Sequence, residues 1–133
     1  MTLRNSRKRY MSRILLVEDN ELNRDMLSRR LERKGYEVLL AIDGEEGIEK
    51  ARSHRPDLIL LDMRLPHISG WDVARFLKQS SDTREILIVA LTADAMDDDR
   101  ERALAVGCDA YDTKPIDFRK LVERIESLLN SRA

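Results

Sequence analysis

Acidic, hydroxyl and amino side chains follow four of the aliphatic runs in this sequence. Glu18 and Asp19 come directly after ILLV, Asp62 follows LILL, and Thr92 follows ILIVAL. Lys114 comes after a weaker run near the C-terminus. An ionised carboxylate is costly to bury unless it is paired, so Asp62 is either a helix cap or a reagent. The other side chains decide between these two possibilities.

Three carboxylates that lie close together repel one another and take up protons unless a cation sits among them. Oxygen ligands favour Mg²⁺ or Mn²⁺, and Mg²⁺ often binds in company with phosphate. With a divalent ion and Lys114 beside the acids, the site becomes electropositive and could receive a dianion. A carboxylate can be the nucleophile in phosphoryl transfer, which mainly needs positioning and charge neutralisation. Asp62 is therefore predicted to be a phosphoacceptor.

Five short aliphatic runs alternate with longer helical patterns from Arg13 onward. Runs without polar alternation are typical of strands that are covered on both faces. The predicted strands are 14–17, 38–41, 58–61, 86–91 and 108–111. Crossovers of helix length predict an α/β domain with a doubly wound, five-stranded parallel sheet and five helices. Such sheets bind ligands at the carboxyl ends of their strands, where these polar side chains are placed.

Periodicity and capping residues define the expected helices. Leu22, Met26, Leu27 and Leu31 are expected to form the buried stripe of the first helix, which Gly35 ends. The other expected caps are Asp43 with Glu46, Ser69 with Asp72, Asp97 to Asp99, Gly107 and Asp117. Trp71 is expected to pack on a helix surface and Cys108 to be a small buried hydrophobe.

Length and composition limit the classes of protein that this chain could belong to. The 133 residues suffice for one domain, and a net charge of -1 does not favour nucleic acid as the main partner. A single cysteine and the lack of a long apolar run predict a cytoplasmic protein without a membrane span. We expect a flexible basic extension over residues 1–12, one domain over 13–130 and a tail over 131–133.

The segments VEDNELN, LLDMRLPHISGWD, ALTA and YDTKP together resemble the receiver domain of two-component response regulators. The resemblance extends from about Arg13 to Asn130, and it implies a flavodoxin-like strand order of 2-1-3-4-5. VEDNELN is most similar to receivers of phosphorelays and of single-domain cell-cycle and polarity regulators. The function implied is a single-domain response regulator, with a phosphorylation-independent interaction module as the alternative.

The resemblance assigns roles to the polar residues at the strand ends. Asp62 would accept a phosphoryl group from a phosphohistidine. Asp19, Asp62 and the carbonyl of Arg64 would bind Mg²⁺ directly, and Glu18 would act through water. Lys114 would pair with the phosphoryl oxygens.

The resemblance also implies a switch and a set of partners. Thr92 would hydrogen-bond to the phosphoryl group, Tyr111 would turn inward when Thr92 moves, and Lys114-Pro115 would be a cis peptide. A sensor histidine kinase or a histidine phosphotransfer protein would be the phosphoryl donor. A downstream protein would bind the surface of the fourth helix, fifth strand and fifth helix, without direct contact to nucleic acid or membrane. The chain would catalyse only its own phosphorylation and slow autodephosphorylation.

Arg64 bears on two further expectations. Aspartyl-phosphate phosphohydrolases carry a second acid two residues after the nucleophile, where it acts as the general acid and base. An arginine at this position cannot give up a proton near neutral pH and so cannot take that role. This disfavours a phosphohydrolase, and acids in the first loop disfavour a flavin-binding protein. Arg64 and Asp94 should also edge the pocket mouth, where an ion pair between them would slow attack by water.

Overall fold

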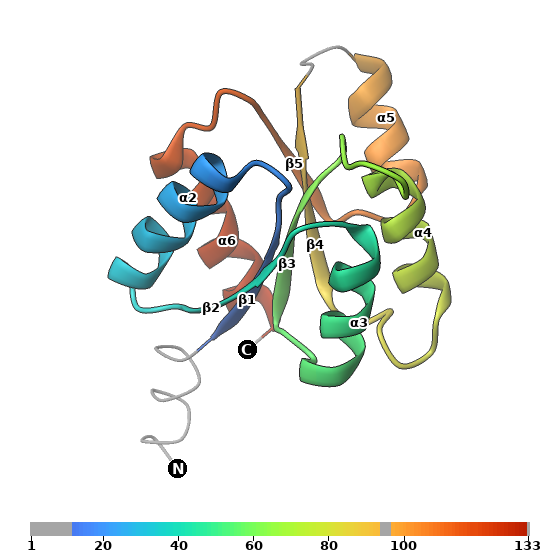
Figure 1. Cartoon of the computed structure of the whole chain (residues 1–133), viewed down its shortest axis with the longest axis horizontal. Helices are drawn as coiled ribbons and strands as arrows, with labels where there is room; N and C mark the ends of the chain where they lie inside the picture. The colour runs from blue at the N-terminus through green and yellow to red at the C-terminus, as the bar shows by residue number, and fades with distance from the viewer. Residues whose placement is uncertain (1–11, 94–96, 133) are drawn as a thin grey trace.

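The computed structural model describes residues 12–93 and 97–132, so the predicted N-terminal extension lies almost wholly outside it. Strands and helices alternate along the chain (Figure 1). The strands are β1 (Arg13–Val17), β2 (Glu37–Ala41), β3 (Leu58–Asp62), β4 (Leu87–Thr92) and β5 (Ala110–Thr113). The helices are α2 (Glu21–Arg33), α3 (Gly44–His54), α4 (Gly70–Gln79), α5 (Asp97–Ala105) and α6 (Phe118–Arg132).

The five strands form one parallel sheet in the order β2-β1-β3-β4-β5. This order confirms the doubly wound, flavodoxin-like fold that was expected. β1 and β3 lie side by side. The chain passes from β1 outward to β2, then returns to β3 on the other side of β1 and continues in that direction to β4 and β5. The loops after β1 and β3 therefore meet where the strand order reverses, which is the usual ligand site of such sheets.

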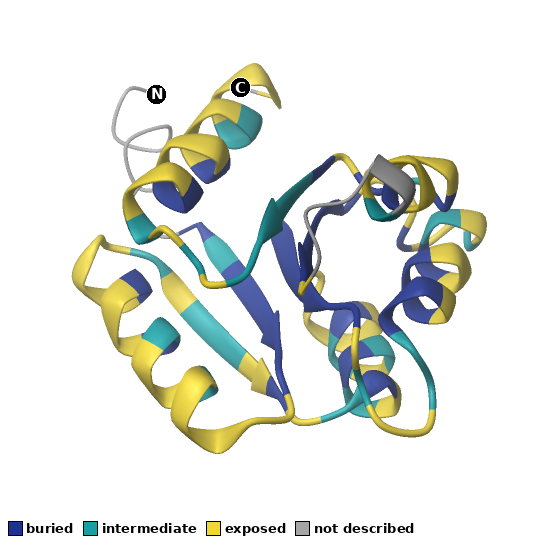
Figure 2. Ribbon diagram, turned by 90° about the horizontal axis from the view of Figure 1, so that it is seen from above, coloured by how far each residue is buried: buried dark blue, intermediate teal, exposed yellow. Residues whose placement is uncertain are grey.

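Helices cover both faces of the sheet (Figures 1 and 2). α2 and α6 pack on one face, and α3, α4 and α5 pack on the other. Alternate residues of each central strand point to opposite faces, and all five residues of β3 are buried. The continuous run LILLD is therefore explained by burial on both sides rather than by a helix.

The expected capping residues begin and end the helices. The Asp43 carboxylate accepts a hydrogen bond from the Glu46 amide at 2.9 Å, and the Ser69 hydroxyl accepts one from the Asp72 amide at 3.3 Å. Gly35 follows α2 with a φ of 96°, a left-handed conformation that favours glycine. The local signals in the sequence thus place the helix ends.

The expected buried stripe of α2 was wrong in part. The side chains of Leu22 and Met26 are 79% and 57% exposed, whereas Leu31 is fully buried. Nine residues separate Leu22 from Leu31, which is two and a half helical turns, so the two point in opposite directions. Trp71 also differs from expectation, because it is buried in the core.

The fifth strand begins later than the sequence pattern suggests, at Ala110 instead of Cys108. Cys108 itself is buried, as expected. Among the residues that the structure describes, none of the helices has the length and apolar character needed to cross a membrane.

Candidate functional site

Four neighbouring strands bring the predicted site residues to one edge of the sheet. Glu18 follows β1 directly, Asp62 ends β3, Thr92 ends β4, and Lys114 follows β5. Because all the strands are parallel, their carboxyl ends lie on the same side. β2, at the outer edge of the sheet, contributes none of these predicted groups. The strand order therefore assembles the site that the sequence predicts.

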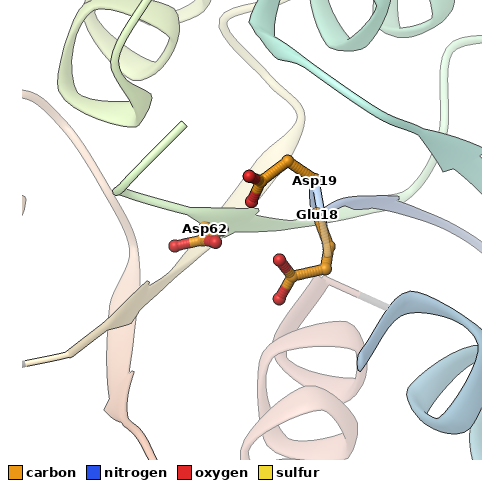
Figure 3. A group of neighbouring side chains, drawn as sticks. All are labelled: Glu18, Asp19 and Asp62. Carbon is orange, nitrogen blue, oxygen red and sulfur yellow. The ribbon is translucent and has the colours of Figure 1, made fainter. Parts of the chain in front are cut away.

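Three carboxylates from two loops converge in this site. Glu18, Asp19 and Asp62 face a common space (Figure 3), and one oxygen of each lies within 4.8 Å of the others. Glu18 and Asp62 are buried, and Asp19 is exposed. Three carboxylate oxygens so close together match the ligand set of a hard divalent cation.

Lys114 is the cation that the structure places among these acids. Its Nζ atom lies 3.2 Å from Glu18 Oε1 and 3.2 Å from Asp62 Oδ2. The other oxygen of Asp62 accepts a hydrogen bond from the Arg64 amide at 3.0 Å. One ammonium group thus faces two buried carboxylates and cannot neutralise both.

Burial and charge shift the pKa values of two groups in the site. Burial raises the pKa of the Glu18 carboxyl above its ordinary value, and the Asp62 charge adds to this despite opposing contributions from the Asn20 amide and Lys114. Burial alone would lower the pKa of the Lys114 ammonium, but Asp62 and Glu18 outweigh it and raise that pKa. Lys114 is therefore firmly cationic at neutral pH, and Glu18 holds its charge less readily than an exposed glutamate.

Backbone contacts fix the loops that carry the acids. The Glu18 amide donates to the Ala41 carbonyl at 3.0 Å, and the Asn20 amide donates to Glu18 Oε2 at 3.1 Å. Gly70 packs so closely against the end of β3 that an added Cβ would lie 2.5 Å from both the Asp62 carbonyl oxygen and Met63 Cα. The site therefore rests on tight backbone packing as well as on its charged side chains.

The structure also locates the predicted switch residues. Thr92 is 1% exposed, and Tyr111 is half-buried and packs against the core on the α3, α4 and α5 side. Lys114-Pro115 is a cis peptide, as predicted. The Arg64 side chain is exposed, but Asp94 lies outside the described residues, so their ion pair stays a prediction.

Two contributors to the site were missed at the sequence level. Ser69 and Gly70 at the start of α4 signal a helix start, but not the close approach of Gly70 to β3. Arg24, whose guanidinium donates hydrogen bonds to the carbonyls of Glu18 and Asp19, gave no signal, because an arginine near the start of a helix is typical of a surface charge. Both contributions arise from contacts between segments that only the folded chain brings together.

Fold and site together define a class of protein. The family model of the response regulator receiver domain matches residues 14–126. The chain belongs to this family, whose general property is the acceptance of a phosphoryl group on an aspartate.

Curated relatives point to one group within the family. The chain is 44% identical over 116 residues to the polar-differentiation response regulator DivK of Brucella anthropi, covering 87% of this chain and 94% of the relative. It is 43% identical over the same length to DivK of Brucella ovis, with the same coverage. The expected similarity to polarity regulators is confirmed.

Solved structures show the same fold. One is the receiver domain of a sensor histidine kinase from Pseudomonas aeruginosa, with a magnesium ion coordinated in its active site cleft. It has a TM-score of 0.83 and 35% identity, covering 90% of this chain and 98% of that one. A CheY-like receiver domain from Methanospirillum hungatei has a TM-score of 0.84 and 30% identity, covering 91% and 95%.

Proposed function

We propose that this protein is a response regulator that accepts a phosphoryl group on Asp62 from a phosphohistidine of a partner protein. The observation that carries the proposal is the setting of the Asp62 carboxylate. It is 4% exposed, it lies 3.2 Å from the Lys114 ammonium, and it shares its space with Glu18 and Asp19. An aspartate that only capped a helix would not need a lysine and two further carboxylates beside it, whereas a phosphoacceptor needs all of these groups.

The three carboxylates fit Mg²⁺, and Mn²⁺ in its place, because oxygen ligands within 4.8 Å suit a hard cation. Asp19, Asp62 and the Arg64 carbonyl would hold the ion directly, and Glu18 would act through water. When bound, the ion supplies charge neutralisation for a transferring phosphoryl group. The magnesium ion in the related Pseudomonas receiver supports this assignment.

The transfer itself is carried out by groups of this chain. A carboxylate oxygen of Asp62 attacks the phosphorus, the phosphorus–nitrogen bond to the donor histidine breaks, and the leaving imidazole keeps the electron pair and takes up a proton. Lys114 then exchanges its contact with Asp62 for a phosphoryl oxygen. The Thr92 hydroxyl donates a hydrogen bond to a second phosphoryl oxygen, since Thr92 ends β4, the strand beside β3.

This hydrogen bond is the start of the proposed switch. Tyr111 lies on β5, paired beside Ala90 of β4, and Arg100 of α5 lies 6.0 Å from the centre of its ring. A shift of Thr92 toward the phosphoryl group would let Tyr111 move inward and change the surface formed by α5, β5 and α6. A partner that distinguishes the two states by a few kcal/mol suffices to read the signal.

The partners follow from this chemistry. Receiver domains interact with histidine kinases and with downstream targets, and they are signalling modules rather than enzymes. We propose a sensor histidine kinase or histidine phosphotransfer protein as donor, and a protein rather than nucleic acid as target. Slow autodephosphorylation and a cytoplasmic location complete the proposal.

The donor must dock beside the pocket, and exposed apolar side chains lie there. α2 begins two residues after Asp19, and its residues Leu22 and Met26 are 79% and 57% exposed. Leu22 and Met26 are four residues apart on the helix and so form one exposed apolar patch, and contiguous patches of this kind mark contact surfaces. Leu22→Ser should slow phosphorylation by a protein donor and leave phosphorylation by acetyl phosphate unchanged.

Acetyl phosphate with Mg²⁺ tests the proposed function directly. Intact mass should show one phosphoryl adduct on the wild type and none on Asp62→Asn. Asp72→Asn is a matched control, because Asp72 is exposed on α4 and should leave the adduct unchanged. An adduct on Asp62→Asn would move the acceptor elsewhere, and no adduct on any form would favour the phosphorylation-independent interaction module.

A further inference from the structure

The guanidinium group of Arg24 holds the backbone of both acids in the first loop. Its Nη1 atom donates to the Glu18 carbonyl at 2.8 Å and to the Asp19 carbonyl at 3.3 Å. Arg24 lies in the second turn of α2 and is half-buried. It is therefore a contact between the helix and the loop before it, not a free surface charge.

These two contacts add to the other hydrogen bonds that hold the loop. The Glu18 amide is held by β2 through the Ala41 carbonyl, and the Asn20 amide binds the Glu18 carboxylate. Arg24 adds a hydrogen bond to the backbone carbonyl of each of the two acids, Glu18 and Asp19. With the carbonyls of Glu18 and Asp19 drawn toward α2, their carboxylates face Asp62.

We propose that Arg24 is a positioning residue that orients Glu18 and Asp19 for divalent-cation binding. The inference rests on the metal site of the proposed function and adds a residue outside the ligand set. Arg24 contacts backbone carbonyls and touches neither the cation nor the phosphoryl group. It acts through the direction in which the two carboxylates point.

Charge and position make opposite predictions for this residue. A positive charge near the acids repels a cation, so an arginine that acted only through charge would weaken Mg²⁺ binding. Removing it would then tighten binding. An arginine that positions the carboxylates has the opposite effect, because its loss lets the loop adopt orientations in which the ligands no longer converge. The sign of the change in affinity separates the two roles.

The experiment measures Mg²⁺ binding by calorimetry in the absence of any phosphoryl donor. Arg24→Met should raise the Mg²⁺ dissociation constant about three- to tenfold, the order expected for one or two lost hydrogen bonds. Arg24→Lys, which keeps the charge but has a shorter side chain without the planar guanidinium, should give a dissociation constant between those of the wild type and Arg24→Met. Arg29→Met is the matched control, since Arg29 lies on α2, is exposed and, within the described part of the chain, pairs with Asp25 at 3.1 Å.

Amide hydrogen exchange of the metal-free protein gives a second readout. Arg24→Met should speed exchange at the hydrogen-bonded amides of Glu18 and Asn20, and Arg29→Met should not. Unchanged or tighter Mg²⁺ binding in Arg24→Met, or equal effects in the control, would overturn the inference while leaving the proposed function intact. A wild type that bound no Mg²⁺ would overturn both. Should Arg24→Met not fold, Arg24→Lys carries the same test.

Discussion

Replacing Asp62 by asparagine removes one buried negative charge and keeps the shape of the side chain. Breaking a buried ion pair usually costs about 3–5 kcal/mol, because the remaining partner is left without a counter-charge. Here the remaining partner is Lys114, which still has Glu18 at 3.2 Å. We therefore expect Asp62→Asn to lose much less stability than this in the metal-free protein.

The distances give the size of the effect. At an effective dielectric constant of about 20, the lost attraction between Lys114 and Asp62 at 3.2 Å is about 5 kcal/mol. The repulsion removed between Asp62 and Glu18, whose oxygens lie within 4.8 Å, is about 3.5 kcal/mol on the same basis. A smaller, screened repulsion from exposed Asp19 is relieved too, and a neutral amide costs less to bury. Asp62→Asn should therefore be within about 1 kcal/mol of the wild type, or more stable.

Lys114→Met provides the contrast, because it leaves Glu18 and Asp62 buried together without a cation. It should cost about 3–5 kcal/mol. Urea unfolding with EDTA, followed by far-ultraviolet circular dichroism, measures both variants. Added Mg²⁺ should stabilise the wild type more than Asp62→Asn, because the cation stabilises the form that binds it better. A loss above about 3 kcal/mol for Asp62→Asn in EDTA, the ordinary cost of a broken pair, would refute the reasoning.

Three further predictions concern residues around the site and in the core. Gly70→Ala should destabilise the protein by about 1–3 kcal/mol in urea unfolding, because its Cβ would lie 2.5 Å from backbone atoms of β3. His67 has a φ of 65°, so His67→Gly should raise the unfolding free energy by up to about 1 kcal/mol by relieving left-handed strain. Burial raises the pKa of the Cys108 thiol from 9.0 to about 12, so above pH 9 the unfolded chain releases a proton that the native protein keeps. Stability should thus fall by about 1 kcal/mol between pH 9 and pH 10, and Cys108→Ala should remove this part of the fall.

Local signals in the sequence determined much of the fold. Uninterrupted aliphatic runs predicted buried parallel strands, since a strand that is covered on both faces needs no polar alternation. Asp43, Ser69 and Gly35 predicted helix ends, because caps satisfy backbone groups within a few residues. The order of the strands came from the resemblance to receivers, and the structure confirms it.

The candidate site was predictable for a related reason. Parallel strands end on the same side of a sheet, so polar residues that follow the strands must gather there whatever the details of packing. Glu18, Asp62, Thr92 and Lys114 each follow or end a strand, so position in the chain placed them at one edge of the sheet, and the strand order made them neighbours there.

Packing between neighbouring elements and loops decided the rest. Leu22 and Leu31 are both apolar and lie on opposite sides of α2, and the packing of α2 on the sheet decides which of these two sides is buried. The contact of Arg24 with two carbonyls and the approach of Gly70 to β3 depend on distances of a few ångström between segments. A sequence pattern specifies which face of a helix is apolar, but only the folded chain determines which atoms that helix meets.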